Sequence, residues 1–174
     1  MLGGSITGGS LNKADGLGAN LLVEGTLTMR GSTLSTNDGY VVDVMNNSSY
    51  SLDKCSVITR DRGNTIRNTT SDFVWDTDGL VYNRGGNAIQ NTANAKFTLK
   101  NGTIQTDSGK AIDSNYQNTA VIIDGGTIKT GNVGIYSGDI TMNGGTILGS
   151  HSRNITGIFI ADNYNLTING GEIN

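Results

Sequence analysis

The sequence predicts an all-β fold: a right-handed parallel β-helix, or solenoid, of about seven laps with three short strands in each lap. Three observations point to it: a repeat of 23 or 24 residues, apolar residues at fixed places in each repeat, and corners rich in Gly and Asn. Residues 1–174 are expected to form a single β-helix segment of a longer chain. The repeat already runs near both termini, and the ends of a solenoid need a cover.

The repeat is marked by a tight turn that recurs along the chain at intervals of 23, 23, 23, 24, 24, 19 and 26 residues. An apolar residue stands three places before each marker, and another stands two places after it. Self-similarity at a fixed period is the signature of stacked structural units. The eight markers are Gly9, Ser32, Cys55, Asp78, Gly102, Gly126, Gly145 and Gly171.

The two apolar columns are expected to fill the interior of the coil. In residues 97–104, Phe97 and Leu99 alternate with Thr98, which is the period-two pattern of a strand with one buried face. Each strand should pair with its equivalent one lap away, about 4.8 Å distant. The column before the markers is Ile6, Met29, Leu52, Trp75, Leu99, Ile123, Met142 and Ile168, and the column after them is Leu11, Leu34, Val57, Leu80, Ile104, Ile128, Ile147 and Ile173.

Another short strand is expected later in each unit, at residues 40–42, 64–66, 87–89, 110–112, 134–136 and 157–159. Beside it, Asn68, Asn91 and Asn115 each fall thirteen places after their marker. Stacked amides bond to one another and to turn backbone, so we interpret these residues as a structural asparagine ladder, with sugar binding as the alternative.

Composition excludes several classes of function. The net charge is −3 and the 12 Lys and Arg residues are scattered, whereas a nucleic-acid groove needs clustered cations. No apolar stretch approaches the ~18 residues of a membrane span, so no membrane insertion is expected. The single cysteine, Cys55, cannot form a disulfide within the chain. No cofactor is expected.

The stacked units at residues 97–104, 121–128, 140–147 and 166–173 resemble the repeats of right-handed parallel β-helix proteins, the pectin-lyase-like superfamily. The likeness is nearest to the Gly/Asn/Thr-rich stretches of bacterial surface adhesins and phage tail appendages, and it covers nearly the whole chain. It implies a non-catalytic rod at a cell surface, in the extracellular space or on a virion. Such a rod acts as a spacer or as an adhesin-like module that binds a glycan or another surface polymer.

The same resemblance implies an enzymatic alternative, because the superfamily also holds polysaccharide lyases and glycoside hydrolases. Asp53, Asp76 and Asp78 are the candidates for an acid–base pair or a Ca²⁺ site on one face. Arg30 and Lys100 flank these acids, which favours an ordinary solvated charge ladder. The polygalacturonase-like pattern also needs a Gly-His-Gly, and the only histidine here lies in Ser-His-Ser. We therefore favour a non-enzymatic role.

Breaks in the period are the places where a binding surface is expected, because loops on a rigid solenoid often carry binding. The last interval, of 26 residues, carries a loop at 148–156 with His151, Arg153 and Asn154 as candidate glycan contacts. Arg60 and Arg62 make a similar corner earlier in the chain. Inert surface loops are the alternative interpretation. A third class of function is self-association, either end to end into filaments or as trimers.

Overall fold

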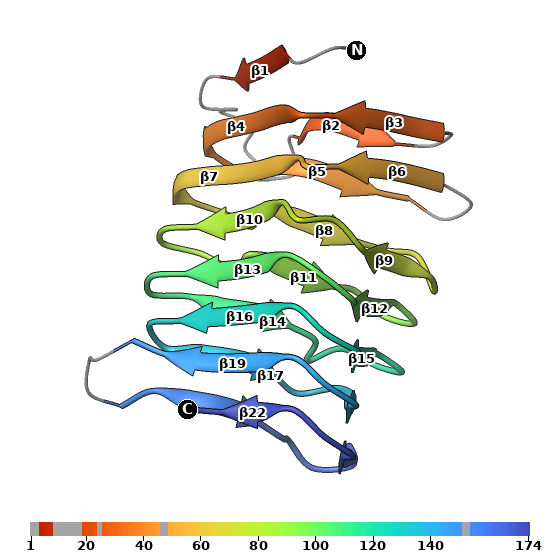
Figure 1. The fold of residues 1–174 in the computed structure, drawn as a ribbon, viewed down its shortest axis with the longest axis vertical. Coiled ribbons are helices and arrows are strands. Elements are labelled where there is room, and N and C mark those ends of the chain that lie inside the picture. Colours follow the sequence, from red (N-terminus) through yellow and green to blue (C-terminus); the bar gives the residue numbers. More distant parts are fainter. Residues whose placement is uncertain (1–3, 9–18, 24–25, 46–48, 151–153) are drawn as a thin grey trace.

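The computed structural model describes residues 4–8, 19–23, 26–45, 49–150 and 154–174, and these residues form 22 β-strands and no helix. The strands follow one another in laps of three and pair in parallel with their equivalents on neighbouring laps (Figure 1). They complete about six turns, close to the seven predicted. The predicted all-β parallel solenoid with three strands per turn is confirmed.

Three columns of strands give the rod three faces. The first sheet consists of β1 (Gly4–Gly8), β4 (Ser32–Asp38), β7 (Ser56–Arg62), β10 (Leu80–Asn83), β13 (Thr103–Thr106), β16 (Thr127–Thr130), β19 (Thr146–Gly149) and β22 (Glu172–Ile173). The second sheet consists of β2 (Ala19–Val23), β5 (Tyr40–Val44), β8 (Ile66–Asn68), β11 (Ile89–Asn91), β14 (Lys110–Asp113), β17 (Val133–Tyr136) and β20 (Thr156–Phe159).

The third face has two stretches. One pairs β3 (Thr26–Arg30) with β6 (Ser49–Asp53), and the other holds β9 (Phe73–Trp75), β12 (Lys96–Leu99), β15 (Ala120–Ile123), β18 (Asp139–Met142) and β21 (Leu166–Ile168). In Figure 1 the first sheet runs leftward along the near side, the chain returns behind it, and each lap lies below the one before. The coil is therefore right-handed, the hand in which twisted parallel strands pack back on their sheet.

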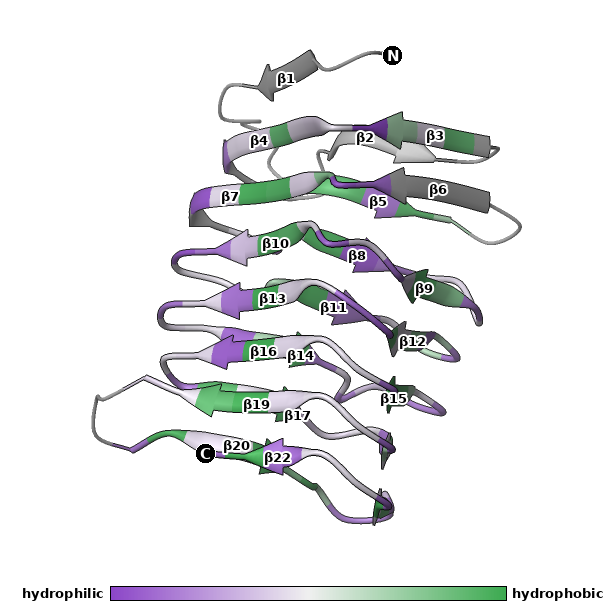
Figure 2. Ribbon diagram, viewed as in Figure 1, coloured by the Kyte–Doolittle hydropathy of each residue, from purple (hydrophilic) through white to green (hydrophobic). Residues whose placement is uncertain are grey.

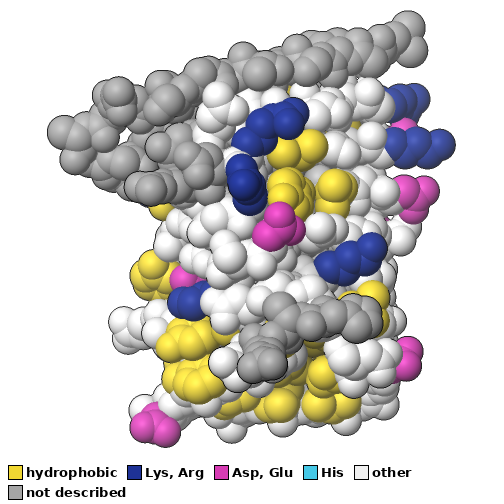
Figure 3. Space-filling view, turned by 90° about the vertical axis from the view of Figure 1, so that its left-hand side faces the viewer, with side chains coloured by type: hydrophobic (Ala, Val, Ile, Leu, Met, Phe, Trp, Pro, Cys, Tyr) yellow, Lys and Arg dark blue, Asp and Glu magenta, His cyan; other side chains and the backbone are white. Residues whose placement is uncertain are grey.

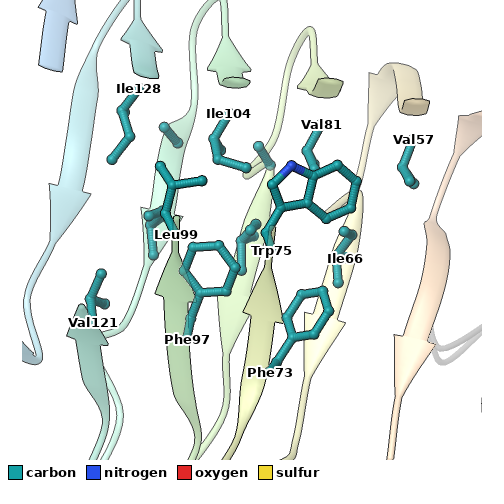
Figure 4. Packing of buried hydrophobic residues seen from close by; sticks show 14 of the residues in the cluster. Val57, Ile66, Phe73, Trp75, Val81, Phe97, Leu99, Ile104, Val121 and Ile128 are labelled. Atoms are coloured by element: carbon teal, nitrogen blue, oxygen red, sulfur yellow. The ribbon is translucent and has the colours of Figure 1, made fainter. Parts of the chain in front are cut away.

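The core is a stack of apolar side chains inside the coil, with hydrophilic residues gathered at the corners (Figures 2 and 4). Trp75, Leu99 and Ile123 lie in register on adjacent laps and have no exposed surface. Beside them the rings of Phe73 and Phe97 are 5.6 Å apart. Each such burial contributes about 1.5–3 kcal/mol before the entropy of ordering the chain is subtracted. The predicted inward column is confirmed for these laps, and the side chain of Leu52 lies outside the described residues.

Two predicted register positions are wrong. Ile6 pairs with Leu34 of the first sheet and does not share a column with Met29. Both inward columns carry apolar residues, so the pattern of the first lap fitted either one. The other predicted member of that lap, Leu11, lies outside the described residues.

The second error falls in the fourth lap, where Val81 and not Leu80 points inward. Val81 pairs with Val57 and Ile104 and is buried, whereas Leu80 pairs with Ser56 and is half-buried on the outer face. Four residues, 76–79, join β9 to β10, and three residues, 100–102, join β12 to β13. The extra residue in the earlier turn shifts the strand by one place relative to the marker, and such a shift exchanges the inner and outer faces.

The asparagine ladder is confirmed for two of its three predicted members. Asn68 and Asn91 are buried, and the Asn68 Nδ2 donates to Asn91 Oδ1 at 2.9 Å. Asn91 Nδ2 then donates at 2.8 Å to the hydroxyl of Ser114, which occupies the next place in the ladder. Asn115 is exposed, so its prediction as a ladder residue is wrong. Counted from the marker, the ladder position in this lap falls one residue earlier than in the two preceding laps, so Ser114 occupies it in place of Asn115.

Candidate functional site

The three acidic candidates lie at the corner between the third face and the first sheet. Asp53 forms an ion pair with Arg30 at 3.1 Å, with the two side chains 51% and 75% exposed. Asp76 and Asp78 are exposed in one turn, and Asp78 accepts a hydrogen bond from Asn101 at 2.6 Å. Among the residues that the structure describes, no group of three His, Cys, Asp or Glu side chains could hold a metal ion. Their catalytic and Ca²⁺ roles stay predictions.

The basic and polar loop candidates are only partly within the described residues. Asn154 is exposed and has a left-handed backbone, with φ of 65°. Arg60 is exposed on β7. His151 and Arg153 lie outside the described residues, as does the side chain of Arg62. A hollow of about 460 Å³ lies where the first sheet passes to the second, in the later laps. It is lined by Gln105, Thr106, Asp107, Lys129, Thr130, Gly131, Leu148, Gly149 and Ser150.

A different surface, which the sequence analysis did not single out, lies on the outside of the second sheet. On β14 the residues Ala111, Ile112 and Asp113 are buried and Lys110 is half-buried, and Lys110 and Asp113 lie at the two ends of the strand. The same arrangement on β17 and β20 places Tyr136 and Phe159 in register with Asp113. We define the aromatic face as the side chains Tyr40, Asp43, Arg67, Gln90, Lys110, Asp113, Tyr116, Tyr136 and Phe159, of which Asp43 and Asp113 are buried.

Both cations of the aromatic face are paired with carboxylates. Arg67 donates through Nε to Asp43 Oδ1 at 2.9 Å and through its terminal nitrogen to the other carboxylate oxygen. The hydrogen bonds that Arg67 donates to Asp43 raise the pKa of Arg67 further. Lys110 Nζ lies 3.2 Å from Asp113 Oδ1 and 3.7 Å from the ring centre of Tyr136. These pairs fix the long side chains and leave a face with little net charge.

Hydrogen bonds link the tyrosines across laps. The hydroxyl of Tyr40 donates to Gln90 Oε1 at 2.9 Å, and Gln90 Nε2 donates to the hydroxyl of Tyr116 at 2.8 Å. Burial raises the pKa of Tyr116, so its hydroxyl stays protonated over a wider pH range. The rings of Tyr136 and Phe159 stack at 4.7 Å with an angle of 5° between their planes. Hydrophobic side chains also gather over the later laps in Figure 3.

A hollow of about 360 Å³ lies beside this face, where the second sheet passes to the third face. It is lined by Asn115, Tyr116, Gln117, Asn118, Asp162, Asn163 and Tyr164. These residues come from corners two laps apart, and the hydroxyl of Tyr164 donates to the Tyr116 carbonyl at 2.7 Å. We call it the short-lap hollow.

Corner lengths explain the short-lap hollow. Residues 114–119 join β14 to β15, and residues 160–165 join β20 to β21, but only residues 137–138 join β17 to β18. The middle corner is thus four residues shorter than its neighbours, and it leaves a gap between them. Gly138 permits this close approach, since it has φ of 87° and a Cβ there would lie 2.9 Å from Ser114 Cβ. The 19-residue interval between the markers Gly126 and Gly145 is the sequence signal of this short corner.

No protein-family model, curated protein or solved structure matches the chain. What the structure supports of the sequence resemblance is the parallel β-helix architecture. Within the described residues, no helix is long and apolar enough to cross a membrane.

Proposed function

We propose that the protein is a non-catalytic β-helical rod that binds a glycan or similar surface polymer through its aromatic face, outside the cell, at a cell surface or on a virion. The observation that carries this proposal is the row of partly exposed rings among amide, hydroxyl and paired charged groups. Phe159 is 41% exposed and Tyr116 is 38% exposed. An aromatic ring covers the apolar face of a sugar, while neighbouring amides and hydroxyls bond to its hydroxyl groups.

The rigidity of the rod supports the same proposal. Strands on three faces and buried polar ladders hold the outward side chains at fixed spacing, and a site on rigid elements loses little entropy on binding. The spacing between laps is about 4.8 Å, so a chain of sugars lying along the rod meets a new set of side chains on each lap. A long polymer therefore gains contacts that a single sugar does not.

The test is a glycan array probed with the purified protein, followed by titration calorimetry with the glycans that bind. Phe159→Ala removes an exposed ring, so we expect at least a tenfold loss of affinity with little loss of stability. The matched control is Ile122→Ala, which truncates a half-buried outward residue on the third face. Equal binding by both variants would contradict the proposal. Depolymerisation of a bound glycan, abolished by Asp76→Ala, would instead establish the enzymatic alternative.

End-to-end association is a second candidate, favoured by the apolar side chains of the last lap. Leu166, Ile168 and Ile173 are exposed, although they continue the inward columns of the earlier laps. Another lap would cover them and would extend the sheets, whether a second copy or a continuation of the same chain supplies it. Light scattering and electron microscopy of the protein at high concentration test this. Monomers at all concentrations would contradict it, and Ile168→Lys should dissolve any filaments.

A further inference from the structure

We infer that the short-lap hollow is the subsite that holds one neutral pyranose residue of the glycan, an inference that rests on the binding role proposed above. The hollow lies at the end of the aromatic face, and Tyr116 belongs to both. A polymer bound on the aromatic face therefore meets the hollow at the edge where the second sheet passes to the third face.

The size of the hollow fits one sugar ring. Ligand sites span roughly 300–1,000 Å³, and at about 360 Å³ this hollow lies near the small end. A single pyranose fits that space. The neighbouring corners 114–119 and 160–165 form its two walls, and the two-residue corner 137–138 leaves the space between them.

The lining has the chemistry of a site for a sugar. Tyr116 and Tyr164 contribute one ring to each wall. Around them stand the amides of Asn115, Gln117 and Asn163, and amides both donate and accept hydrogen bonds. A sugar hydroxyl also donates and accepts hydrogen bonds, so neighbouring hydroxyls of one sugar can bond to these amides.

The walls are held in place before any ligand arrives. The Tyr164 hydroxyl bonds to the Tyr116 carbonyl and ties one wall to the other. Thr119 Oγ1 donates to the same carbonyl at 2.8 Å and also bonds to the carbonyl of Ser114. Asn118 Nδ2 bonds to Asn94 on the preceding lap at 3.0 Å. A preorganised lining loses little entropy when it binds, which favours an uncharged ligand, such as a sugar, that gains only modest energy from each contact.

The charges select a neutral sugar over an acidic one. Asp162 is the charged residue of the lining, and Lys and Arg are absent from it. The nearest cations of the aromatic face, Lys110 and Arg67, already pair with Asp113 and Asp43. A uronate or sialate carboxylate would therefore meet a like charge without a partner cation.

The experiment uses two-dimensional NMR and titration calorimetry of the whole protein with two matched sets of probes. One set consists of neutral hexose and N-acetylhexosamine oligosaccharides, and the other of uronate oligosaccharides of the same length and linkage. We expect shifts of residues 115–118 and 162–164 with the neutral set, and at least tenfold weaker binding of the uronates. Asp162→Asn should reduce the difference in affinity between the neutral and the uronate oligosaccharides. Tighter binding of the uronates by the unaltered protein would overturn the inference.

Two variants separate the hollow from the aromatic face. Gln117→Ala removes a lining amide, and an insertion of four Gly, Ser or Asn residues between Ser137 and Gly138 lengthens the short corner to match its neighbours. Both should weaken binding of the neutral probe at least tenfold while thermal unfolding of the Gln117 variant stays unchanged. If Phe159→Ala weakens binding but neither of these variants does, the proposed function stands and the subsite is refuted. If no glycan binds the unaltered protein, both fail.

Discussion

Truncation of Leu99 to alanine tests the register of the core directly. Leu99 has no exposed surface, and its partners in register are Trp75 on one side and Ile123 on the other. Such a truncation removes transfer free energy and leaves a cavity, which together cost about 2–5 kcal/mol. The upper half of that range is expected, because strands on both neighbouring laps hold the walls of the cavity apart.

Urea unfolding is the assay, and the protein carries its own reporter. Its one tryptophan, Trp75, is buried beside Leu99, so its fluorescence follows exposure of this part of the core. The matched control is Lys100→Ala, an exposed neighbour whose loss should change the free energy of unfolding by less than about 0.5 kcal/mol. Repeat proteins unfold in more than one step when their cooperativity breaks down, so the midpoint of the tryptophan transition is the quantity to compare.

A double-mutant cycle sharpens the test. Leu99→Ala and Ile123→Ala share one column, so their costs should differ from additivity by about 0.5–3 kcal/mol. Leu99→Ala and Leu34→Ala lie on different sheets and on laps far apart, so their costs should add within about 0.5 kcal/mol. A cost below 0.5 kcal/mol for Leu99→Ala, or additivity with Ile123→Ala, would refute the stacked column.

Three further predictions concern the corners and the outer face. Gly102→Ala should lower the thermal midpoint clearly more than Gly31→Ala, since both have positive φ but only at Gly102 would a Cβ meet a backbone oxygen, at 2.2 Å. Asn91→Ala should lower the free energy of unfolding in urea by about 1–3 kcal/mol, because it leaves the buried side chains of Asn68 and Ser114 without this hydrogen-bond partner. Asn115→Ala should lower it little, because Asn115 is exposed. Burial, and then a carboxylate hydrogen bond, raise the pKa of Tyr82 to about 12, so its contribution to stability is complete below pH 10 and is lost as the pH rises from 10 to 12. Ultraviolet titration of Tyr82→Phe should lack that late ionisation, and an unchanged titration would contradict the assignment.

The strands could be predicted from the sequence because each lap repeats the same local pattern. Phe97 and Leu99 alternate with a polar residue, and the equivalents of this pattern on other laps fix which face is buried. That redundancy fails where a corner changes length. Counting from Asp78 predicts that Leu80 points inward, but the turn contains one extra residue, and Val81 takes the inward place.

The aromatic face and the short-lap hollow could not be predicted in the same way. Tyr116 and Tyr164 are 48 residues apart, and they meet because the lap between them has a short corner. The interval of 19 residues is visible in the sequence, but the longer loop that follows it is the more obvious candidate for binding. A shortened corner leaves a gap between its neighbours. The residues of that corner do not themselves predict a binding site.

Short and long laps have opposite physical consequences, and this contrast explains where a solenoid can bind. A long loop adds backbone that must be ordered when a ligand binds, at a cost of about 1–2 kcal/mol for each residue fixed. A short corner adds nothing to be ordered, because the walls of its gap are the ordinary corners of the laps on either side. One of these corners is already held by the hydrogen bond of Thr119 to the Tyr116 carbonyl and by that of Asn118 to Asn94 on the preceding lap. Shortening one corner by four residues therefore creates a preformed hollow at little cost in stability. The reduction in lap length, and not the insertion, is the change in the repeat that we connect with binding.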